Sequence, residues 1–495
     1  MKILFAASEA QPLIKTGGLA DVAGSLPQAI AGLGHDVRLV LPAYPAAVEK
    51  SSPLVEVAKL ALPGSADPVR ILEGHLGPQL PLYLIDAPHL FDRRGNPYTT
   101  SAGTDWPDNA QRFSLFCRAI AALSMNRAGL GWNPDLVHCN DWQTGLVPAF
   151  LATEENRPAT LFTIHNLAYQ GVFDRATFDS LNLDPALWSP QGLEFHRNFS
   201  FIKGGLAFSD WITTVSPTYA REICTPALGY GLEGLLQHRV TRLQGVLNGI
   251  DYLLWDPATD PSIVQHFDQT TFERKVSNKL ALQQELGLPQ NEDAQMFGHI
   301  GRLVEQKGVD LILNVLPGML QRPDLQLVLL GSGDSGLERS LLQTAGAHPS
   351  RVAAVIGYDE QLAHRIEAAC DCFLMPSRFE PCGLNQLYSL RYGTVPIVHR
   401  TGGLADTVVD ATPKSLLNAS ATGFVFDYPH ESALWRAVER AIDFWSRPKS
   451  WWSKLAISGM SQDFSWDSSA QNYLVIYQKA IDDPAQNPLT GLGIP

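Results

Sequence analysis

Short apolar runs alternate along the chain with longer segments in which apolar residues recur every three or four positions. The first run, KILFAAS from Lys2, is followed by a glycine-rich turn, a helical pattern over about residues 19–33, a closing Gly34 and a second run over 37–42. Runs of this kind are typical of buried parallel strands, and their alternation with amphipathic segments predicts a doubly wound sheet. Further strands are predicted at 80–86, 135–139, 159–165 and 211–216.

The second half of the chain repeats the alternation, with strands predicted at 296–303, 326–333, 352–358, 372–377 and 395–400. A turn-forming Asn-Gly places the change of domain near 246–257. We therefore predict an α/β protein of two Rossmann-like, doubly wound domains that face one another across a deep cleft. Their predicted extents are 1–244 and 245–462, followed by a helix over 463–481 that packs back on the first domain and a frayed tail over 482–495. We expect the ligand at the carboxyl ends of both sheets.

The composition of the chain disfavours several classes of binding partner and cofactor. The chain has 495 residues and a formal net charge of −13, which disfavours nonspecific binding to nucleic acid or to an anionic membrane. The apolar run at the N-terminus is too short for a signal peptide, and six cysteines without a regular framework suit a reducing cytoplasm. A metal site at Cys370, Cys372 and Cys382 is a disfavoured alternative, because no His–Cys spacing follows.

The segment KTGGLADV is the first candidate binding loop. Gly17 and Gly18 let the backbone approach a ligand, the following helix presents free N–H groups, and Lys15 adds a full charge. The spacing is not GxGxxG, which argues against a dinucleotide-dependent dehydrogenase. A tight strand-to-helix turn is the alternative interpretation. The same six residues, TGGLAD, recur at 401–406 after Arg400, and there we expect mainly a tight turn whose glycines allow close packing.

Two segments of the second half carry charged candidates. Arg302 and Lys307 flank a strand-to-helix connection, where they converge on one anion or simply remain two solvated cations. Glu380 ends an apolar strand just before Pro381, which favours the first position of a helix. Its carboxylate either caps that helix or holds sugar hydroxyls and stabilises positive charge at a sugar carbon.

Three further polar residues, His138, Asp141 and His165, follow apolar strands of the first half. A lone histidine at such a position is more often structural, and Asp141 before Trp142 also suits a helix N-cap. These residues become candidates for chemistry only as a group.

Several motifs in the same order resemble those of bacterial glycogen synthases and plant starch synthases, which are retaining glucosyltransferases of the GT-B fold. The resemblance spans nearly the whole chain and rests on the motifs KTGGLADV, HNLAYQG, FIKGGLAFSDWITTVSPTYA, GYGLEGLL, VLNGIDYLLWDP, GRLVEQKG, SRFEPCGLNQLY and RTGGLADTV. It implies transfer of glucose from ADP-glucose to the nonreducing 4-hydroxyl of an α-1,4-glucan. The implied partners are that donor and the glucan; neither a metal nor another cofactor is expected.

The resemblance also assigns roles to single positions. It implies that Arg302 and Lys307 hold the donor's pyrophosphate, that Glu380 contacts the glucose hydroxyls and that His165 binds glucose O6. Asp141 joins these as a catalytic candidate. Substrate-binding positions implied in the same way are Lys15, Gly17, Gly18, Asp21, Tyr98, Asn166, Asn248, Gly357, Tyr358, Cys382, Gly383, Leu384 and Asn385.

Two departures from the family pattern are visible. This chain has HCNDW at 138–142 where the family often has HAHDW, and EPCGLNQ where the family has EPCGLTQ, so Asn385 could alter a hydrogen bond near the phosphate. Alternatives on the same fold are a glucosyltransferase with a small acceptor, such as a sucrose synthase, and a phosphorylase, which would need a far longer chain. A catalytically inactive glucan-binding homologue is the alternative from another class.

Overall fold

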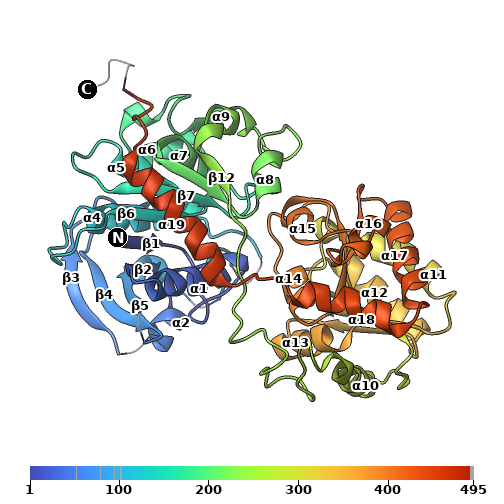
Figure 1. Cartoon of the computed structure of the whole chain (residues 1–495). Helices are drawn as coiled ribbons and strands as arrows, with labels where there is room; N and C mark the ends of the chain where they lie inside the picture. Colours follow the sequence, from blue (N-terminus) through green and yellow to red (C-terminus); the bar gives the residue numbers. More distant parts are fainter. Residues whose placement is uncertain (52, 79, 94, 101–102, 491–495) are drawn as a thin grey trace. The chain divides into compact units, whose positions relative to one another are not determined.

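The computed structural model describes residues 1–51, 53–78, 80–93, 95–100 and 103–490 (Figure 1). They form two compact units. Unit 1 comprises Met1–Gly249 and Trp466–Pro495, and unit 2 comprises Ile250–Ser465. Both points at which the chain changes unit lie a few residues after the positions that the sequence predicted, 244/245 and 462/463.

Unit 1 is built on a nine-stranded sheet in the order β12-β11-β7-β6-β1-β2-β5-β4-β3. Seven of the strands are parallel, whereas β4 is antiparallel to both β5 and β3. The strand bounds are β1 (Lys2–Ala6), β2 (Asp36–Pro42), β3 (Val55–Leu60), β4 (Val69–Leu76), β5 (Leu80–Asp86), β6 (Leu136–Asn140), β7 (Ala159–Ile164), β11 (Trp211–Thr214) and β12 (Leu243–Gly245).

The strand order of this sheet reverses between β1 and β6, because the chain moves outward from β1 through β2 and β5 and then starts again on the other side at β6. Ligands of open α/β sheets bind beyond the carboxyl ends of the strands at such a switch point. In unit 1 a ligand is therefore expected beside the segments that follow β1 and β6. A small antiparallel sheet in the order β8-β10-β9 lies apart from the main one, with bounds β8 (Val172–Phe173), β9 (Glu194–Phe195) and β10 (Asn198–Ser200).

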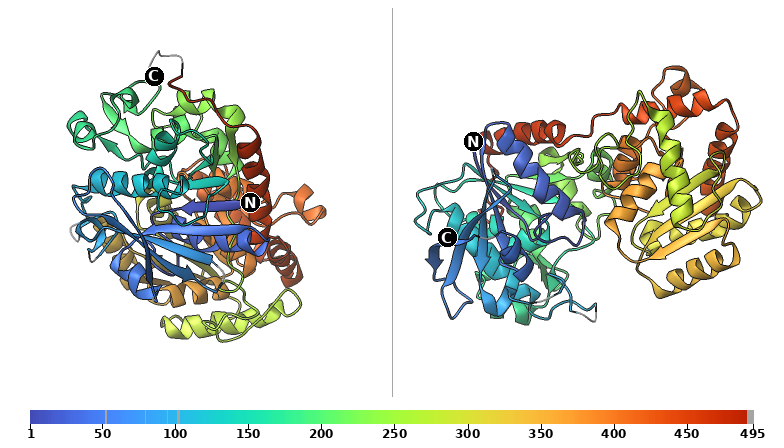
Figure 2. Two further views of the ribbon diagram at one scale, coloured as in Figure 1. Left: turned by 90° about the vertical axis from the view of Figure 1, so that its left-hand side faces the viewer. Right: turned by 90° about the horizontal axis from the view of Figure 1, so that it is seen from below.

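Helices pack on both faces of the unit 1 sheet (Figure 2). Helix α19 (Trp466–Asp482), the last of the chain, packs against α1 (Gly18–Gly32) and against β7. The other helices are α2 (Pro45–Lys50), α3 (Pro88–Phe91), α4 (Asn109–Ser124), α5 (Leu146–Leu151), α6 (Arg175–Ser180), α7 (Phe201–Phe208), α8 (Pro217–Glu222) and α9 (Glu233–His238).

The segment after α19 is held to unit 1, and the prediction of a frayed tail over 482–495 is wrong for the residues that can be described. The backbone N–H of Ala485 donates to Asp210, the Asn487 side chain donates to the Ala152 carbonyl, and Leu489 is buried. Residues 491–495 lie outside the described residues.

Unit 2 has a six-stranded, wholly parallel sheet in the order β15-β14-β13-β16-β17-β18. Numbered within the unit this is 3-2-1-4-5-6, the order of dinucleotide-binding folds, with its switch point between β13 and β16. The strand bounds are β13 (Gln295–Ile300), β14 (Leu325–Gly331), β15 (Val352–Ile356), β16 (Cys372–Met375), β17 (Val395–His399) and β18 (Phe424–Phe426).

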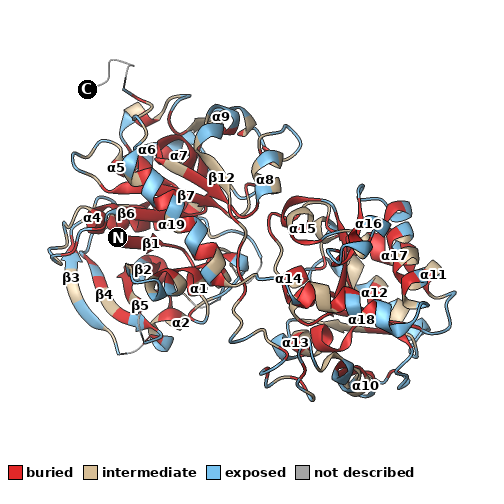
Figure 3. Ribbon diagram, viewed as in Figure 1, coloured by how far each residue is buried: buried red, intermediate tan, exposed pale blue. Residues whose placement is uncertain are grey.

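Apolar clusters fill both sides of this sheet, whereas the outer faces of its helices are exposed (Figure 3). Buried Phe297, Leu327 and Ile397 belong to one cluster, and Met296, Val328 and Phe373 belong to the other. The helices are α10 (Lys275–Glu285), α11 (Val309–Met319), α12 (Ser335–Ala347), α13 (Glu360–Ala369), α14 (Asn385–Arg391), α15 (Gly402–Thr407), α16 (Pro413–Leu417), α17 (Glu431–Trp445) and α18 (Lys449–Met460).

Candidate functional site

In unit 2 the charged candidates gather at the switch point. Arg302 and Lys307 follow β13, and Glu380 follows β16, the strand next to β13 in the sheet. Lys307 Nζ donates to Glu380 Oε2 at 2.6 Å, and the Ser377 hydroxyl donates to the same oxygen at 3.0 Å. Glu380 is only 6% exposed. The structure thus brings a cation and a buried carboxylate, far apart in the sequence, into direct contact.

The two segments that carry these groups are fixed to each other. Arg378 binds Asp310 with two hydrogen bonds of 2.9 and 2.7 Å, and its backbone N–H donates to the Gln306 carbonyl. Gly308 adopts a φ of 69°, and a Cβ there would lie 2.2 Å from the Pro376 carbonyl oxygen. Glycine is therefore required, because it combines a left-handed backbone with a close approach of two loops.

Arg302 differs from Lys307 in its surroundings. It is exposed, and its Nη2 donates a hydrogen bond of 3.4 Å to the Gln306 side chain. An exposed guanidinium beside an ordered Lys–Glu pair can turn toward an anionic ligand with little rearrangement.

The segment after Glu380 differs from the prediction in one respect. Helix α14 begins at Asn385 and not at Pro381, because residues 381–384 form a turn in which Gly383 has a φ of 75°. Cys382 is buried, whereas Gly383 and Leu384 are partly exposed. The Asn385 side chain donates to the Ile300 carbonyl at 2.7 Å, which ties the start of α14 to the end of β13.

The second TGGLAD segment packs directly beneath this turn. Gly402 and Gly403 open α15, and a Cβ on them would lie 1.9 Å from the Glu380 carbonyl oxygen and 2.1 Å from that of Cys382. The prediction that these glycines allow close packing is confirmed, and the packed partner is the backbone around Glu380.

Gly357 and Tyr358 follow β15, farther along the same edge of the sheet. Gly357 has a φ of 145°, and the Tyr358 ring is 77% exposed. The Tyr358 hydroxyl donates to Glu360 at 3.2 Å.

In unit 1 the switch point lies between the segments after β1 and β6. Lys15 Nζ forms a 2.7 Å ion pair with Asp21 on α1, and a Cβ at Gly18 would meet no atom within 4 Å. Gly17 precedes the helix with an extended backbone and provides no side-chain cap. The loop therefore presents a cation and exposed backbone, as the sequence predicted for a binding loop.

Asp141 follows β6 in an unusual backbone conformation, with φ 55° and ψ −179°. This region is almost reserved for glycine, so the fold holds the residue there against strain. Asp141 occupies the N-cap position of the short helix that follows, as the sequence suggested, but its carboxylate makes no capping hydrogen bond and instead accepts the backbone N–H of His165 at 2.8 Å. Burial raises the pKa of Asp141 to about 7 despite hydrogen bonds from the His165 and Asn166 backbones.

His165 lies at the end of β7, where its Nε2 is 2.9 Å from the Asn140 side-chain oxygen. Burial lowers the pKa of His165 to about 3, so the imidazole is neutral near pH 7 and serves as a hydrogen-bonding group. Asn166 accepts the Ala168 backbone N–H in the adjoining turn. His138, by contrast, is wholly buried between Tyr477 of α19 and Thr163, which is a structural role.

Tyr98 and Asn248 complete the predicted positions of unit 1. The Tyr98 hydroxyl is 2.7 Å from the Ser8 hydroxyl at the end of β1, so Tyr98 lies at the same switch point. Asn248 is 5% exposed, and its side-chain oxygen has no hydrogen-bond partner among the described residues.

Sequence reasoning missed Glu9, which lies three residues after the end of β1 and is 3% exposed. Burial raises its pKa to about 7, although Thr16 and Gly17 hydrogen bonds oppose this. Its position one residue beyond an apolar run was the available signal, because a carboxylate at a strand's carboxyl end is a candidate ligand contact.

Features that could indicate other chemistry are few. No group of three or more metal-ligating side chains occurs among the described residues, and all six cysteines are unpaired thiols. No helix in the described part of the chain has both the length and the apolar character to cross a bilayer.

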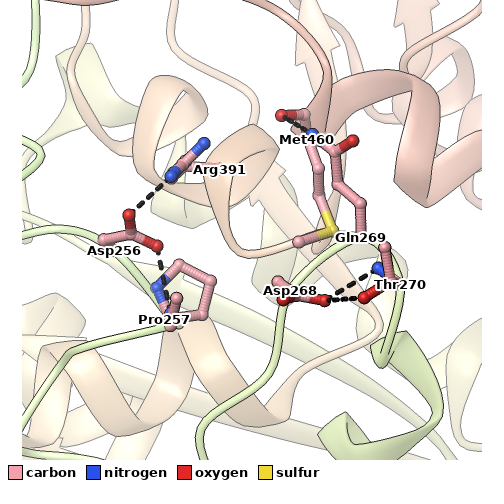
Figure 4. A pocket seen from close by; sticks show the side chains of 8 residues that line it. Asp256, Pro257, Asp268, Gln269, Thr270, Arg391 and Met460 are labelled. Atoms are coloured by element: carbon pink, nitrogen blue, oxygen red, sulfur yellow. Dashed lines mark hydrogen bonds and ion pairs between the residues drawn. The ribbon is translucent and has the colours of Figure 1, made fainter.

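A cavity of about 250 Å³ in unit 2 contains none of the predicted residues (Figure 4). Two of its polar side chains have partners within the chain: Arg391 binds Asp256 at 2.6 Å, and Gln269 donates to the Met460 carbonyl. The lining residues are Asp256, Pro257, Ala258, Asp268, Gln269, Thr270, Arg391 and Met460.

Comparison with known proteins gives concordant results for both units. Residues 2–238 match the family model of the starch synthase catalytic domain, and residues 284–453 match that of glycosyl transferases group 1. The chain is 56% identical to glycogen synthase 2 of Nitrosococcus oceani, over 97% of each chain. It is 54% identical to the glycogen synthase of Thioalkalivibrio sulfidiphilus, over 97% of this chain and 100% of the other.

A solved structure is also similar. The catalytic domain of starch synthase IV from Arabidopsis thaliana, bound to ADP and acarbose, superposes with a TM-score of 0.88 at 34% identity. The match covers 97% of this chain and 99% of that one.

Proposed function

The chain belongs to the glycogen synthase family of GT-B glycosyltransferases, and from that premise we propose that it transfers glucose from ADP-glucose to the nonreducing 4-hydroxyl of an α-1,4-glucan with retention of configuration. The observation that carries the proposal is the contact between Lys307 and the buried Glu380 at the switch point of unit 2, with Arg302 on the same loop. The cation suits the phosphate groups of a nucleotide sugar, and the carboxylate suits its sugar hydroxyls.

In this proposal Arg302 and Lys307 bind the diphosphate of the donor. A charge pair about 4 Å apart at an effective dielectric near 20 contributes roughly 4 kcal/mol. This attraction grows as negative charge develops on the departing ADP, so it stabilises the transition state more than the bound donor. Two cations supply that charge without a metal, and we expect transfer to persist in excess EDTA.

In this proposal Glu380 binds the glucose of the donor. Lys307 and Ser377 orient its carboxylate, which accepts hydrogen bonds from sugar hydroxyls and stabilises positive charge developing at C1. We assign Tyr358 to the adenine, because its exposed ring offers a stacking face. A starch synthase relative is bound to ADP and acarbose, which supports a nucleotide and a saccharide as the ligands of this family.

The residues of unit 1 act on the sugar and the acceptor. Neutral His165 is suited to hydrogen-bond glucose O6, since it neither carries charge nor loses a proton near pH 7. Asp141, Asn166, Tyr98 and Asn248 contribute further sugar contacts, and Lys15 assists donor binding.

For retention we propose a front-face displacement. The bond between C1 and the diphosphate oxygen breaks, the bond between C1 and the acceptor O4 forms on the same face, and the acceptor proton passes to the departing phosphate. A double displacement would instead form a glucosyl ester on a carboxylate. Mass spectrometry of the protein mixed with ADP-glucose should find no such ester on Glu380 or Asp141; finding one would overturn the displacement but leave the overall reaction intact.

The reaction itself is tested by analysing the product. ADP-[¹⁴C]glucose and glycogen are incubated with the protein, and the polymer is digested with β-amylase, which releases maltose from the nonreducing ends of α-1,4 chains. We expect labelled maltose. Label in small acceptors alone would indicate a small-molecule glucosyltransferase, and no ADP release would indicate an inactive glucan-binding homologue.

A further inference from the structure

Glu9 has no role in the proposed function. It lies three residues after Ala6, the last residue of the central strand β1 of unit 1, and Asp141 lies directly after the neighbouring strand β6. Both carboxylates are therefore at the switch point of the sheet, where ligands of this architecture bind. Asp141 contacts the His165 segment, whereas Glu9 contacts the other binding segment, the KTGGLADV loop.

The carboxylate of Glu9 closes the base of that loop. Its Oε2 accepts the backbone N–H of Thr16 at 2.5 Å and the Thr16 hydroxyl at 2.7 Å. The backbone N–H of Gly17 donates to the same carboxylate. Thr16 lies between Lys15 and Gly17, so the contact fixes the backbone on which the loop cation and the two glycines are arranged.

The contacts of Glu9 lie directly before helix α1. The residue before the helix is Gly17, which has no side chain with which to cap it. Glu9 does not replace such a cap, because its carboxylate binds the backbone N–H groups of Thr16 and Gly17, before the helix, and so fixes the chain where it enters α1. Its charge also suits the positive end of the α1 dipole.

A comparison within the same sheet separates this arrangement from ordinary structural burial. Asp210, before β11, likewise accepts the backbone N–H and the hydroxyl of one threonine, Thr160, at 2.7 and 3.0 Å. Asp210 also has a full cationic partner, Arg157, at 2.7 Å. No lysine or arginine in the described part of the chain forms an ion pair with Glu9. A buried carboxylate without a cation costs folding stability, and such costs are typical of functional sites.

We propose that Glu9 is a positioning residue for the donor: by holding Thr16 and Gly17 it sets the shape of the loop that presents Lys15 to the nucleotide sugar. This inference rests on the proposed function, which assigns Lys15 to donor binding. It assigns to Glu9 no contact with the reacting atoms. Residues Lys15, Thr16, Gly17 and Gly18 are all exposed, so the buried Glu9 carboxylate is an anchor for an otherwise exposed loop.

The test is a double-mutant cycle of Glu9→Gln and Lys15→Ala, measured with ADP-glucose and glycogen. The amide of Glu9→Gln keeps the size of the side chain but loses the charge and one acceptor. We expect KM for ADP-glucose to rise roughly tenfold, as loss of a charged hydrogen bond would produce. KM for glycogen should stay within about twofold. In a Lys15→Ala background, Glu9→Gln should have little further effect, because it acts through Lys15.

Two further variants keep the test decisive. Asp210→Asn is the matched control, with a similar carboxylate–threonine contact at a different place; it should lower the melting temperature without changing either KM. Thr16→Val removes only the hydroxyl donor and should raise KM for ADP-glucose by a smaller factor than Glu9→Gln. It replaces Glu9→Gln in the cycle if that variant fails to fold.

The outcomes distinguish failure of the proposed function from failure of the positioning role of Glu9. If the wild-type chain does not transfer glucose from ADP-glucose, the proposed function fails. If the wild type is active but Glu9→Gln behaves like Asp210→Asn, with unchanged KM values, the positioning role is overturned. The role is also overturned if KM for ADP-glucose in the double variant rises by the product of the two single-variant factors, because Glu9 would then act independently of Lys15.

Discussion

Lys15 and Arg400 precede the same six residues, yet their side chains have different partners. Lys15 pairs with Asp21 of the following helix α1, at the switch point of unit 1. Arg400 pairs with Asp427, and both side chains of this pair are about half exposed. Exposed ion pairs contribute little to stability, and Arg400 is not at a switch point.

We therefore predict unequal effects of the two alanine variants. Lys15→Ala should raise KM for ADP-glucose roughly tenfold or more, since it removes a charged contact to the donor. Arg400→Ala should change KM and the melting temperature little, because the lost pair lies in solvent. Steady-state kinetics with ADP-glucose as the varied substrate measures this, and equal losses in the two variants would contradict it.

Asp141 provides a prediction about pH. Its pKa is raised from 3.8 to about 7 in the folded chain, so the fold favours the protonated carboxyl. The Asp141 carboxyl therefore makes its full contribution to the free energy of unfolding below pH 4. That contribution is lost as the pH rises toward 7, where the buried carboxylate ionises. Asp141→Asn removes the charge, so the melting temperature of the variant relative to wild type should increase between pH 4.5 and pH 8, while its transferase activity falls.

Thermal melts of both proteins at several pH values test this directly. A difference in melting temperature that stays constant from pH 4.5 to pH 8 would show that Asp141 is not the group that ionises. The result matters for function because a residue that destabilises the fold when charged is retained for another reason.

At the residue scale, the sequence allowed the candidate positions to be predicted but not their contacts. Arg302, Lys307 and Glu380 were found because each follows an apolar strand, a local feature. The Lys307–Glu380 pair could not be predicted from spacing, since 73 positions separate the two residues and the strand order joins them. Glu9 was missed because its partners, Thr16 and Gly17, become visible only once the loop is folded.

At the scale of elements, the two TGGLAD segments begin helices in different surroundings. In α1 the position of Gly18 is open, whereas in α15 the position of Gly403 is filled by the Cys382 carbonyl. Identical sequence thus gives one helix start that faces outward and one that packs against the Glu380 turn.

This contrast predicts opposite phenotypes. Gly403→Ala should destabilise the chain by about 1–3 kcal/mol, since the new methyl group forces the backbone of the Glu380 turn to move. Gly18→Ala should fold as stably as wild type, because its methyl group meets no atom, but should raise KM for ADP-glucose by obstructing the approach of the ligand. Denaturant unfolding combined with kinetics separates the two effects; a stable Gly403→Ala variant with unchanged kinetics would contradict the packing role.

The prediction of elements succeeded where burial was complete. Central strands such as β1, β7 and β14 are buried along their whole lengths or nearly so, and they gave continuous apolar runs. The antiparallel pair β3 and β4 was missed because much of it is exposed and its pattern is mixed. The start of α14 was placed too early because Pro381 is a common first helical residue, whereas here Gly383 turns the chain before the helix begins.

At the scale of the whole molecule, the chain is two compact units, each with its own sheet and its own switch point. The groups assigned to the diphosphate and the adenine all lie in unit 2. ADP should therefore stabilise that unit more than unit 1. A saturating ligand at a hundred times its Kd adds about 2.7 kcal/mol to the free energy of unfolding.

Calorimetry should show this as a shift of one transition. A domain of this size gains about 2–4 °C per kcal/mol, so ADP should raise the unit 2 transition by roughly 5–10 °C. The Gly403→Ala variant identifies that transition, because it should lower it selectively. A shift of the other transition alone would place the nucleotide in unit 1 and contradict the assignment.

The central claim is that this chain uses ADP-glucose to extend an α-1,4-glucan, and a donor competition measures it most directly. ADP-glucose and UDP-glucose, each with a different isotope in the glucose, are supplied together at equal concentration with glycogen as acceptor. We predict that the polymer gains label chiefly from ADP-glucose. Label chiefly from UDP-glucose, or a polymer that gains none, would contradict the account.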